Sequence, residues 1–124
     1  MTVLVDSDVL IEVTRGRDRD IVARWEEIAR SEDVLLCSPI SVAEVWHGAR
    51  PNEHEGLTNL FRTLTCVAAD ARTGFLAGEY LRQYRKSHSV ELGDALIAAA
   101  AVENGAALWT RNRKHYPMKG LSFY

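Results

Sequence analysis

The sequence has few of the residues that mark several common kinds of site. Its two cysteines, Cys37 and Cys66, lie in separate short apolar runs and not in a CxxC or similar metal-binding spacing. Two buried free thiols are therefore expected, rather than a disulfide, a zinc site or a redox centre. The chain also has no GxxxxGK[ST] or GxGxxG loop, so no motif supports the binding of a nucleoside triphosphate.

Long apolar runs are absent as well. No stretch approaches the roughly 20 apolar residues that a membrane-spanning helix needs. Asp6 and Asp8 interrupt the apolar N-terminus before the hydrophobic segment of a signal peptide could form. The sequence therefore predicts a cytoplasmic protein with no membrane segment.

Composition indicates one folded domain over residues 1–124. Hydrophobic residues make up 47% of the chain and charged residues 26%, a balance that argues against wholesale disorder. A chain of this length buries a single core without staples. The net charge of -2 does not resemble a strongly basic nucleic-acid-binding protein. Basic residues nevertheless gather locally, because no acid follows Glu103 while Arg111, Arg113, Lys114 and Lys119 do.

Apolar runs alternate with helical patterns along the chain. Four short runs are typical of strands covered on both faces, at residues 3–5, 34–37, 64–68 and 106–109. Three segments between them have clear helical patterns, at residues 21–29, 70–86 and 91–105. This alternation predicts a three-layer α/β domain with a mainly parallel central sheet flanked by helices. In such folds ligands bind beyond the carboxyl ends of the strands, where Asp6 and the segment after Trp109 emerge.

Three acids stand at the borders of predicted core elements. Asp6 follows Val3-Leu4-Val5, Glu44 ends the segment Ser41-Val42-Ala43-Glu44, and Asp94 precedes a run of eight apolar residues. Acids are rarely buried unless they are paired or bound to a metal, so three of them suggest one shared site. Without a cation, their mutual repulsion would raise some of their pKa values and destabilise the ionised cluster. The sequence thus predicts a divalent-metal site for phosphate chemistry.

Each acid also has a structural interpretation. Asp6 fits a helix N-cap. Glu44 and Ser41 have the spacing of a capping box, which is the preferred interpretation of Glu44 when it is taken alone. Asp94 fits a first-turn acid stabilised by the helix dipole, although it lies deeper than Glu91. Asp8 fits a second metal ligand, a residue that positions water, or a first-turn acid equally well.

The segment after the last predicted strand is polar and basic. Thr110 and Asn112 are placed to hydrogen-bond to a ligand-bearing acid or to water, although Asn112 fits a turn residue equally well. The neighbouring basic side chains are candidates to face phosphate. The four histidines lack a catalytic or metal-binding spacing and are expected at the surface or in packing: His47, His54, His88 and His115.

Four motifs follow one another along almost the whole chain, from about residue 2 to about residue 116. They are Asp6-Ser7-Asp8-Val9-Leu10-Ile11, Ser41-Val42-Ala43-Glu44, Glu91-Leu92-Gly93-Asp94-Ala95-Leu96-Ile97-Ala98 and Thr110-Arg111-Asn112. In this order and context they resemble the PIN-domain nucleases, and most of all the VapC-type toxins of toxin-antitoxin systems. The resemblance implies a Mg²⁺- or Mn²⁺-dependent endoribonuclease, usually a homodimer, that a cognate VapB-type antitoxin inhibits.

The resemblance also assigns roles by matching motif. It implies that Asp6, Glu44 and Asp94 are catalytic metal ligands, and that Asn112 is a catalytic residue where many relatives have Asp. Asp8, where relatives often have Asn, and Thr110 are implied as supporting residues. Three basic residues are candidates to bind RNA, namely Arg111, Arg113 and Lys114. Mg²⁺ prefers oxygen ligands and retains waters, one of which can attack the phosphodiester, but one-metal and two-metal sites remain equally open.

Two other functions compete with this interpretation. Asp6-Ser7-Asp8 after a strand also resembles the nucleophile and acid of haloacid-dehalogenase-type phosphatases. That family's lysine is unmatched, because the only lysine before Lys114 is Lys86 in a predicted surface helix, and no later acidic pair follows. The third hypothesis is a noncatalytic PIN-like module that binds RNA or protein, which Asn112 makes possible.

Overall fold

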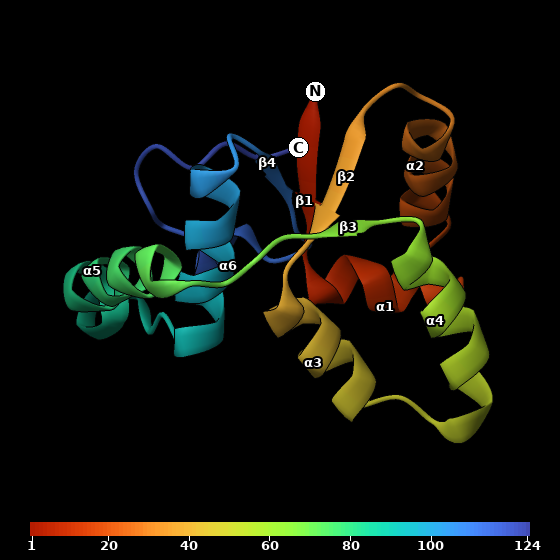
Figure 1. Ribbon diagram of the computed structural model, residues 1–124, viewed down its shortest axis with the longest axis horizontal. Coiled ribbons are helices and arrows are strands. Elements are labelled where there is room, and N and C mark those ends of the chain that lie inside the picture. The colour runs from red at the N-terminus through yellow and green to blue at the C-terminus, as the bar shows by residue number, and fades with distance from the viewer.

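A four-stranded parallel sheet forms the centre of the protein, with the strand order β3-β2-β1-β4 (Figure 1). The computed structural model describes residues 1–124. The strands are β1 (Thr2–Val5), β2 (Val34–Cys37), β3 (Thr65–Cys66) and β4 (Ala107–Trp109). In the register of β1, Leu4 pairs with Leu36 of β2 and with Leu108 of β4. The carboxyl end of β1 therefore lies between those of its two neighbours.

Six α-helices connect and cover the strands. They are α1 (Ser7–Arg15), α2 (Arg19–Ala29), α3 (Pro39–His47), α4 (His54–Arg62), α5 (Ala71–His88) and α6 (Leu92–Glu103). Two short 3-10 helices complete the fold, η1 (Pro51–Glu53) and η2 (Arg113–His115). In Figure 1, α5 and α6 lie on one side of the sheet, and α1 to α4 lie on the other. None of these helices combines the length and the apolar character needed to cross a membrane.

The two faces of the sheet bury separate hydrophobic clusters, because successive strand residues point to opposite faces. Leu4, Leu36 and Leu108 belong to the cluster beneath α5 and α6. Val3, Val5 and Trp109 belong to the cluster beneath the other helices. This arrangement confirms the predicted three-layer α/β fold with a parallel central sheet.

The alanine-rich helix α6 lies directly against the sheet. Ala95, Ala98, Ala99 and Ala101 are completely buried in the first cluster. Their small side chains leave room for α5 to pack across α6, and Tyr80 of α5 is buried there. Tyr80 is thus a residue of the hydrophobic core.

The cysteines agree only in part with the sequence prediction. Both are free thiols, and Cys37 of β2 is buried as expected. Cys66, however, is exposed. The prediction that it is buried was wrong because β3 consists of only two residues and forms an edge of the sheet, so that only one neighbouring strand covers it.

Candidate active site

Asp6 lies at the carboxyl end of β1, where its backbone N–H donates to the carbonyl of Trp109 at 2.9 Å. Its side chain is only 5% exposed. Oδ1 accepts the backbone N–H of Ser7 at 2.8 Å, so Asp6 caps α1. Oδ2 accepts two hydroxyl hydrogen bonds, from Thr110 at 2.9 Å and from Tyr116 at 2.8 Å. Capping and a place at the centre of a buried polar group are therefore compatible for this residue.

Asp8 lies beside Asp6, in the first turn of α1. Its Oδ1 and Oδ2 are 3.3 and 3.2 Å from the backbone nitrogen of Arg111, which donates to them, and Oδ2 also accepts from the Thr110 hydroxyl at 3.4 Å. Burial, and then the neighbouring charge of Asp6, raise the pKa of Asp8 to about 6. Asp8 is therefore a first-turn acid of α1 that also accepts hydrogen bonds from the segment after β4.

Glu44 does not form the predicted capping box. The N-cap of α3 is Ser38, whose hydroxyl oxygen accepts the N–H of Ile40 at 3.1 Å. The prediction was wrong because Pro39, which suits the first position of a helix, starts α3 before Ser41. Glu44 instead accepts the hydroxyl of Ser7 at 3.3 Å. Burial, and then the charge of Asp6, raise the pKa of Glu44.

Asp94 lies in the first turn of α6, where its Oδ2 accepts the backbone N–H of Glu91 at 3.2 Å. Asp94 is therefore a first-turn acid, as its structural interpretation expected, and it also accepts a hydrogen bond from the N-cap residue of α6. Burial nevertheless raises its pKa, against the opposing effect of the Glu91 N–H. The neighbouring Gly93 lies against α3, where a Cβ at this position would be 3.6 Å from Oε2 of Glu44, an ordinary contact.

The four acids Asp6, Asp8, Glu44 and Asp94 line one polar cavity of about 470 Å³. The remaining walls come mainly from the start of α1, the loop before α6 and the segment after β4, through Ser7, Ser89, Glu91, Ile97, Asn112, His115 and Tyr116. The sequence elements that carry the acids are far apart in the chain, but the parallel sheet brings their ends to one edge. The structure therefore places the predicted residues Asp6, Glu44, Asp94 and Asn112 around a common space.

The segment after β4 forms one wall of this cavity. The Thr110 hydroxyl accepts the backbone N–H of Asn112 at 3.1 Å, while the Asn112 side-chain nitrogen lies 3.2 Å from Nε2 of His115. His115 was expected at the surface or in packing, and it is exposed but also faces the cavity. Tyr116 was not predicted as a site residue at all. No residue spacing marks either side chain, because only the irregular path through η2 brings them to the acids.

The candidate RNA-binding residues differ in their surroundings. Arg111 makes ion pairs with Glu12 at 3.3 Å and with Asp18 at 3.5 Å. The Arg113 guanidinium lies over the ring of Phe123 and donates to the carbonyl of Tyr124 at 3.3 Å. Lys114 is exposed on η2.

The chemistry of the cavity fits a hydrated divalent cation. No three acidic, histidine or cysteine side chains lie close enough to one another to bind a metal ion as a preformed set. The carboxylates are nevertheless hard oxygen donors around one cavity, and repulsion by Asp6 helps to raise the pKa of its neighbours Asp8 and Glu44. A cation would relieve that repulsion, and Mg²⁺ commonly retains several waters between itself and its protein ligands. These donors therefore suit Mg²⁺ or Mn²⁺ bound partly through water.

Comparison with known proteins agrees with this geometry. A family model described as the PIN domain matches residues 3–121. Ribonuclease VapC10 of Mycobacterium tuberculosis is 39% identical over 118 residues, which cover 94% of this chain and 86% of that protein. Ribonuclease VapC1 of Methanocaldococcus jannaschii is 28% identical over 116 residues, which cover 92% of this chain and 78% of the relative.

Solved structures have the same fold. VapBC2 of Rickettsia felis, bound to a DNA fragment from its promoter, matches with a TM-score of 0.83 at 20% identity, over 100% of this chain and 98% of the other. VapBC-1 of nontypeable Haemophilus influenzae matches with a TM-score of 0.79 at 20% identity, over 100% of this chain and 97% of the other. With a family model that spans nearly the whole sequence, the chain belongs to the PIN-domain family.

Proposed function

We propose that this protein is a metal-dependent endoribonuclease and the toxin of a VapBC-type toxin-antitoxin system. The observation that carries the proposal is the convergence of Asp6, Asp8, Glu44 and Asp94 on one cavity. The 39% identity to a protein named as a ribonuclease, over 94% of this chain, supports the same activity. The reaction is the hydrolysis of an RNA phosphodiester bond.

Asp6, Glu44 and Asp94 are the residues that would hold Mg²⁺ or Mn²⁺. When bound, the ion lowers the pKa of water and neutralises charge that develops on the phosphate. The Thr110 and Tyr116 hydroxyls hold Oδ2 of Asp6 in place, while Ser7 bridges Asp6 and Glu44 through its backbone N–H and its hydroxyl. These contacts fix the direction of the carboxylates before the substrate arrives.

The other cavity residues have supporting roles. Asp8 adds negative charge beside Asp6 and fastens the segment after β4 through the Arg111 N–H. Asn112 supplies an amide, which orients water or the sugar-phosphate backbone without adding a fourth carboxylate ligand to Asp6, Glu44 and Asp94. Lys114 and Arg113 lie next to it on η2 and are proposed to contact RNA phosphates.

The phosphatase hypothesis requires Asp6 to attack phosphorus directly. Both oxygens of its carboxylate already accept hydrogen bonds, Oδ1 from Ser7 and Oδ2 from Thr110 and Tyr116. Hydrogen bonds of this kind lower the nucleophilicity of a carboxylate oxygen, whereas carboxylates that bind metal ions are commonly hydrogen-bonded as well. The arrangement fits a fixed metal ligand better.

The proposed partners follow from the relatives. Several similar structures are VapBC assemblies. We propose that a VapB-type antitoxin binds and inhibits this chain, and that the chain forms a homodimer in the cytoplasm.

The decisive experiment compares the wild-type protein with Asp94→Asn on a pool of structured cellular RNAs, with Mg²⁺, with Mn²⁺ and with EDTA. Asparagine retains an oxygen that can accept the Glu91 N–H, so the fold should be preserved. We expect metal-dependent cleavage by the wild type and a loss of about 100-fold or more in the variant. The same loss is expected for Asp6→Asn.

Two outcomes would contradict the proposal. Rapid hydrolysis of p-nitrophenyl phosphate without RNA cleavage would indicate a phosphatase. Metal-independent RNA binding with no cleavage of any RNA in the pool would indicate a noncatalytic module. Equal cleavage by both proteins would reveal a contaminating ribonuclease or remove Asp94 from the mechanism, and repeating the assay with Asp6→Asn would separate these two cases.

A further inference from the structure

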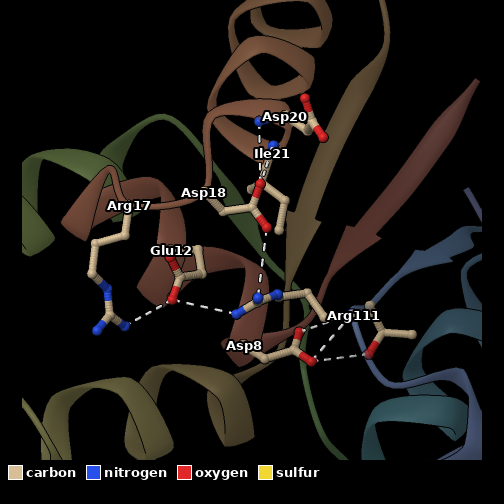
Figure 2. Close-up of polar contacts among 8 residues, drawn as sticks. Asp8, Glu12, Arg17, Asp18, Asp20, Ile21 and Arg111 are labelled. Carbon is tan, nitrogen blue, oxygen red and sulfur yellow. Dashed lines mark hydrogen bonds and ion pairs between the residues drawn. The ribbon is translucent and has the colours of Figure 1, made fainter.

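Glu12 is a buried acid that lies outside the carboxylate cavity. It is one helical turn after Asp8 on α1 and is 5% exposed. Its Oε1 lies 2.8 Å from Nη2 of Arg17 and 3.3 Å from Nη1 of Arg111 (Figure 2). A buried carboxylate is costly unless it is paired, so these two cations account for its position.

Arg111 connects this acid to the candidate active site. Its side chain lies between Glu12 and Asp18, whose Oδ2 is 3.5 Å from Nη2. Its backbone N–H points the other way and donates to both oxygens of Asp8, as Figure 2 shows. One residue therefore joins α1 and the α1–α2 loop to the segment that carries Thr110 and Asn112.

The surroundings of Arg111 argue against a role in binding RNA phosphate. The cavity beside it, of about 520 Å³, is lined by three acids and three arginines whose formal charges cancel: Glu12, Asp18, Asp20, Arg17, Arg19 and Arg111. A phosphate at Arg111 would compete with two carboxylates that its guanidinium already pairs with, and drawing Arg111 away would leave the buried Glu12 with Arg17 alone. A guanidinium held in this way is suited to fixing the backbone of its own segment.

We propose that Glu12 and Asp18 are positioning residues for the reaction. They anchor the Arg111 side chain, and that anchor keeps the Arg111 N–H on Asp8 and the neighbouring Thr110 hydroxyl on Asp6. Neither residue contacts the substrate or the metal. The catalytic consequence rests on the nuclease function proposed above, but the anchor itself does not.

The test uses the full-length chain and two readouts, amide hydrogen exchange by NMR and cleavage kinetics. Glu12→Gln keeps the size of the side chain but removes its charge. We expect the Arg111 amide to exchange about tenfold faster, while the core amides of Leu4 and Leu108 keep their wild-type rates. We also expect kcat for RNA to fall by about 10-fold to 100-fold with KM little changed, as for other residues that support a metal ligand.

Arg17→Ala is the matched control. It removes the other cation from Glu12, but Arg17 has a side chain that is 65% exposed and makes no contact with Asp8. Wild-type exchange at Arg111 and wild-type kcat are expected for this variant. Asp18→Asn serves as a second probe, because asparagine still caps α2 but no longer attracts Arg111 by charge. It should change both readouts in the same direction as Glu12→Gln, and by less.

Three results would overturn the proposal. One is wild-type exchange at Arg111 in both Glu12→Gln and Asp18→Asn, whatever their melting temperatures. Another is faster exchange with unchanged kcat, which would leave the anchor a structural role only. The third is a raised KM with unchanged kcat in both Glu12→Gln and Arg111→Ala, which would make Arg111 an RNA contact. If the wild type cleaves no RNA, the nuclease function fails, and the exchange experiment still decides whether the anchor exists.

Discussion

The hydroxyl of Tyr116 donates a 2.8 Å hydrogen bond to Oδ2 of Asp6, across 110 positions of the chain. The tyrosine is buried, and burial together with the Asp6 charge raises the pKa of Tyr116, so its hydroxyl keeps its proton at any physiological pH. The contact thus holds a carboxylate of the candidate metal site by a permanent donor.

Removing this donor should weaken catalysis more than folding. Tyr116→Phe leaves Oδ2 of Asp6 with only the Thr110 hydroxyl. We expect metal-dependent cleavage to fall by about 10-fold to 100-fold, since partners of metal ligands have effects of this size. Tyr80→Phe is the control, because Tyr80 is also buried but belongs to α5 and lies in the hydrophobic core. Full activity in Tyr116→Phe would remove the tyrosine from the mechanism.

The acid cluster should make the metal-free protein less stable as the pH rises. Folding raises the pKa of Asp8 from 3.8 to about 6. It also raises the pKa of Glu44 above 4.5 and that of Asp94 above 3.8. An acid whose pKa is raised on folding binds more protons in the folded state, so stability falls between its unfolded and folded pKa values. In EDTA, the urea midpoint of unfolding of the wild type should therefore decrease as the pH rises from about 4 to about 6. The midpoint of Asp8→Asn should decrease less over the same range.

Adding Mg²⁺ should reverse this loss, because a ligand that binds only the folded state stabilises it. At pH 7.5 the wild-type midpoint should rise with Mg²⁺ concentration, and that of Asp6→Asn should rise much less. A wild-type midpoint that is indifferent to Mg²⁺ and Mn²⁺ would contradict the assignment of these acids to a metal site.

Position 93 should accept a side chain of one carbon, but a larger side chain should displace Glu44. A Cβ at this position would lie 3.6 Å from Oε2 of Glu44, an ordinary contact, so Gly93→Ala should cleave RNA within about a factor of two of the wild type. Gly93→Val adds two further methyl groups beside Glu44 and should lower cleavage by at least about tenfold. Asp70→Ala is a useful control for stability, because it removes the cap of α5 at a cost of about 1 kcal/mol. Equal activity in Gly93→Val and the wild type would show that the position of Glu44 is unimportant.

Lys114 should contribute to RNA affinity and little to the chemical step. Removing one phosphate contact from single-stranded RNA should reduce the slope of log K against log salt by about 0.7. We expect this change for Lys114→Ala, measured with a fluorescent RNA in EDTA so that no cleavage occurs. Arg30→Ala is the control, because Arg30 follows α2 just before β2 begins. It therefore lies near the amino ends of the strands, whereas the cavity lies at their carboxyl ends. A salt slope unchanged by Lys114→Ala would place the RNA elsewhere.

The convergence of the acids was accessible from the sequence because the period of the apolar residues identifies buried strands, and parallel strands share an edge for their carboxyl ends. Asp6 was therefore placed correctly. The spacing of Ser41 and Glu44 is typical of a capping box, although the pair Ser38-Pro39 already indicates an earlier start of the helix. A start of α3 at Ser38 and a start at Ser41 both agree with the residue preferences of helix N-termini, and the helix begins at the signal that comes first in the chain.

Residues that act through irregular backbone could not be found in this way. Tyr116 and His115 reach the cavity only through the turn of η2, which has no periodicity. Glu12 looks like an ordinary charged residue on a helix, and its burial becomes visible only when Arg111 folds back onto α1. Pairings between distant segments are the part of a site that a single sequence conceals.

The sheet order has a consequence for the moment at which this protein becomes active. Synthesis delivers Asp6 first, but its donors Thr110 and Tyr116 are made 104 and 110 residues later. Contacts between such distant segments form only after a large part of the chain is available. A nascent chain on the ribosome therefore carries Asp6, Asp8, Glu44 and Asp94 before the segment that holds Asp6 in place. If the protein attacks RNA, the translating ribosome and its message are spared until the segment that carries Thr110 and Tyr116 has been made.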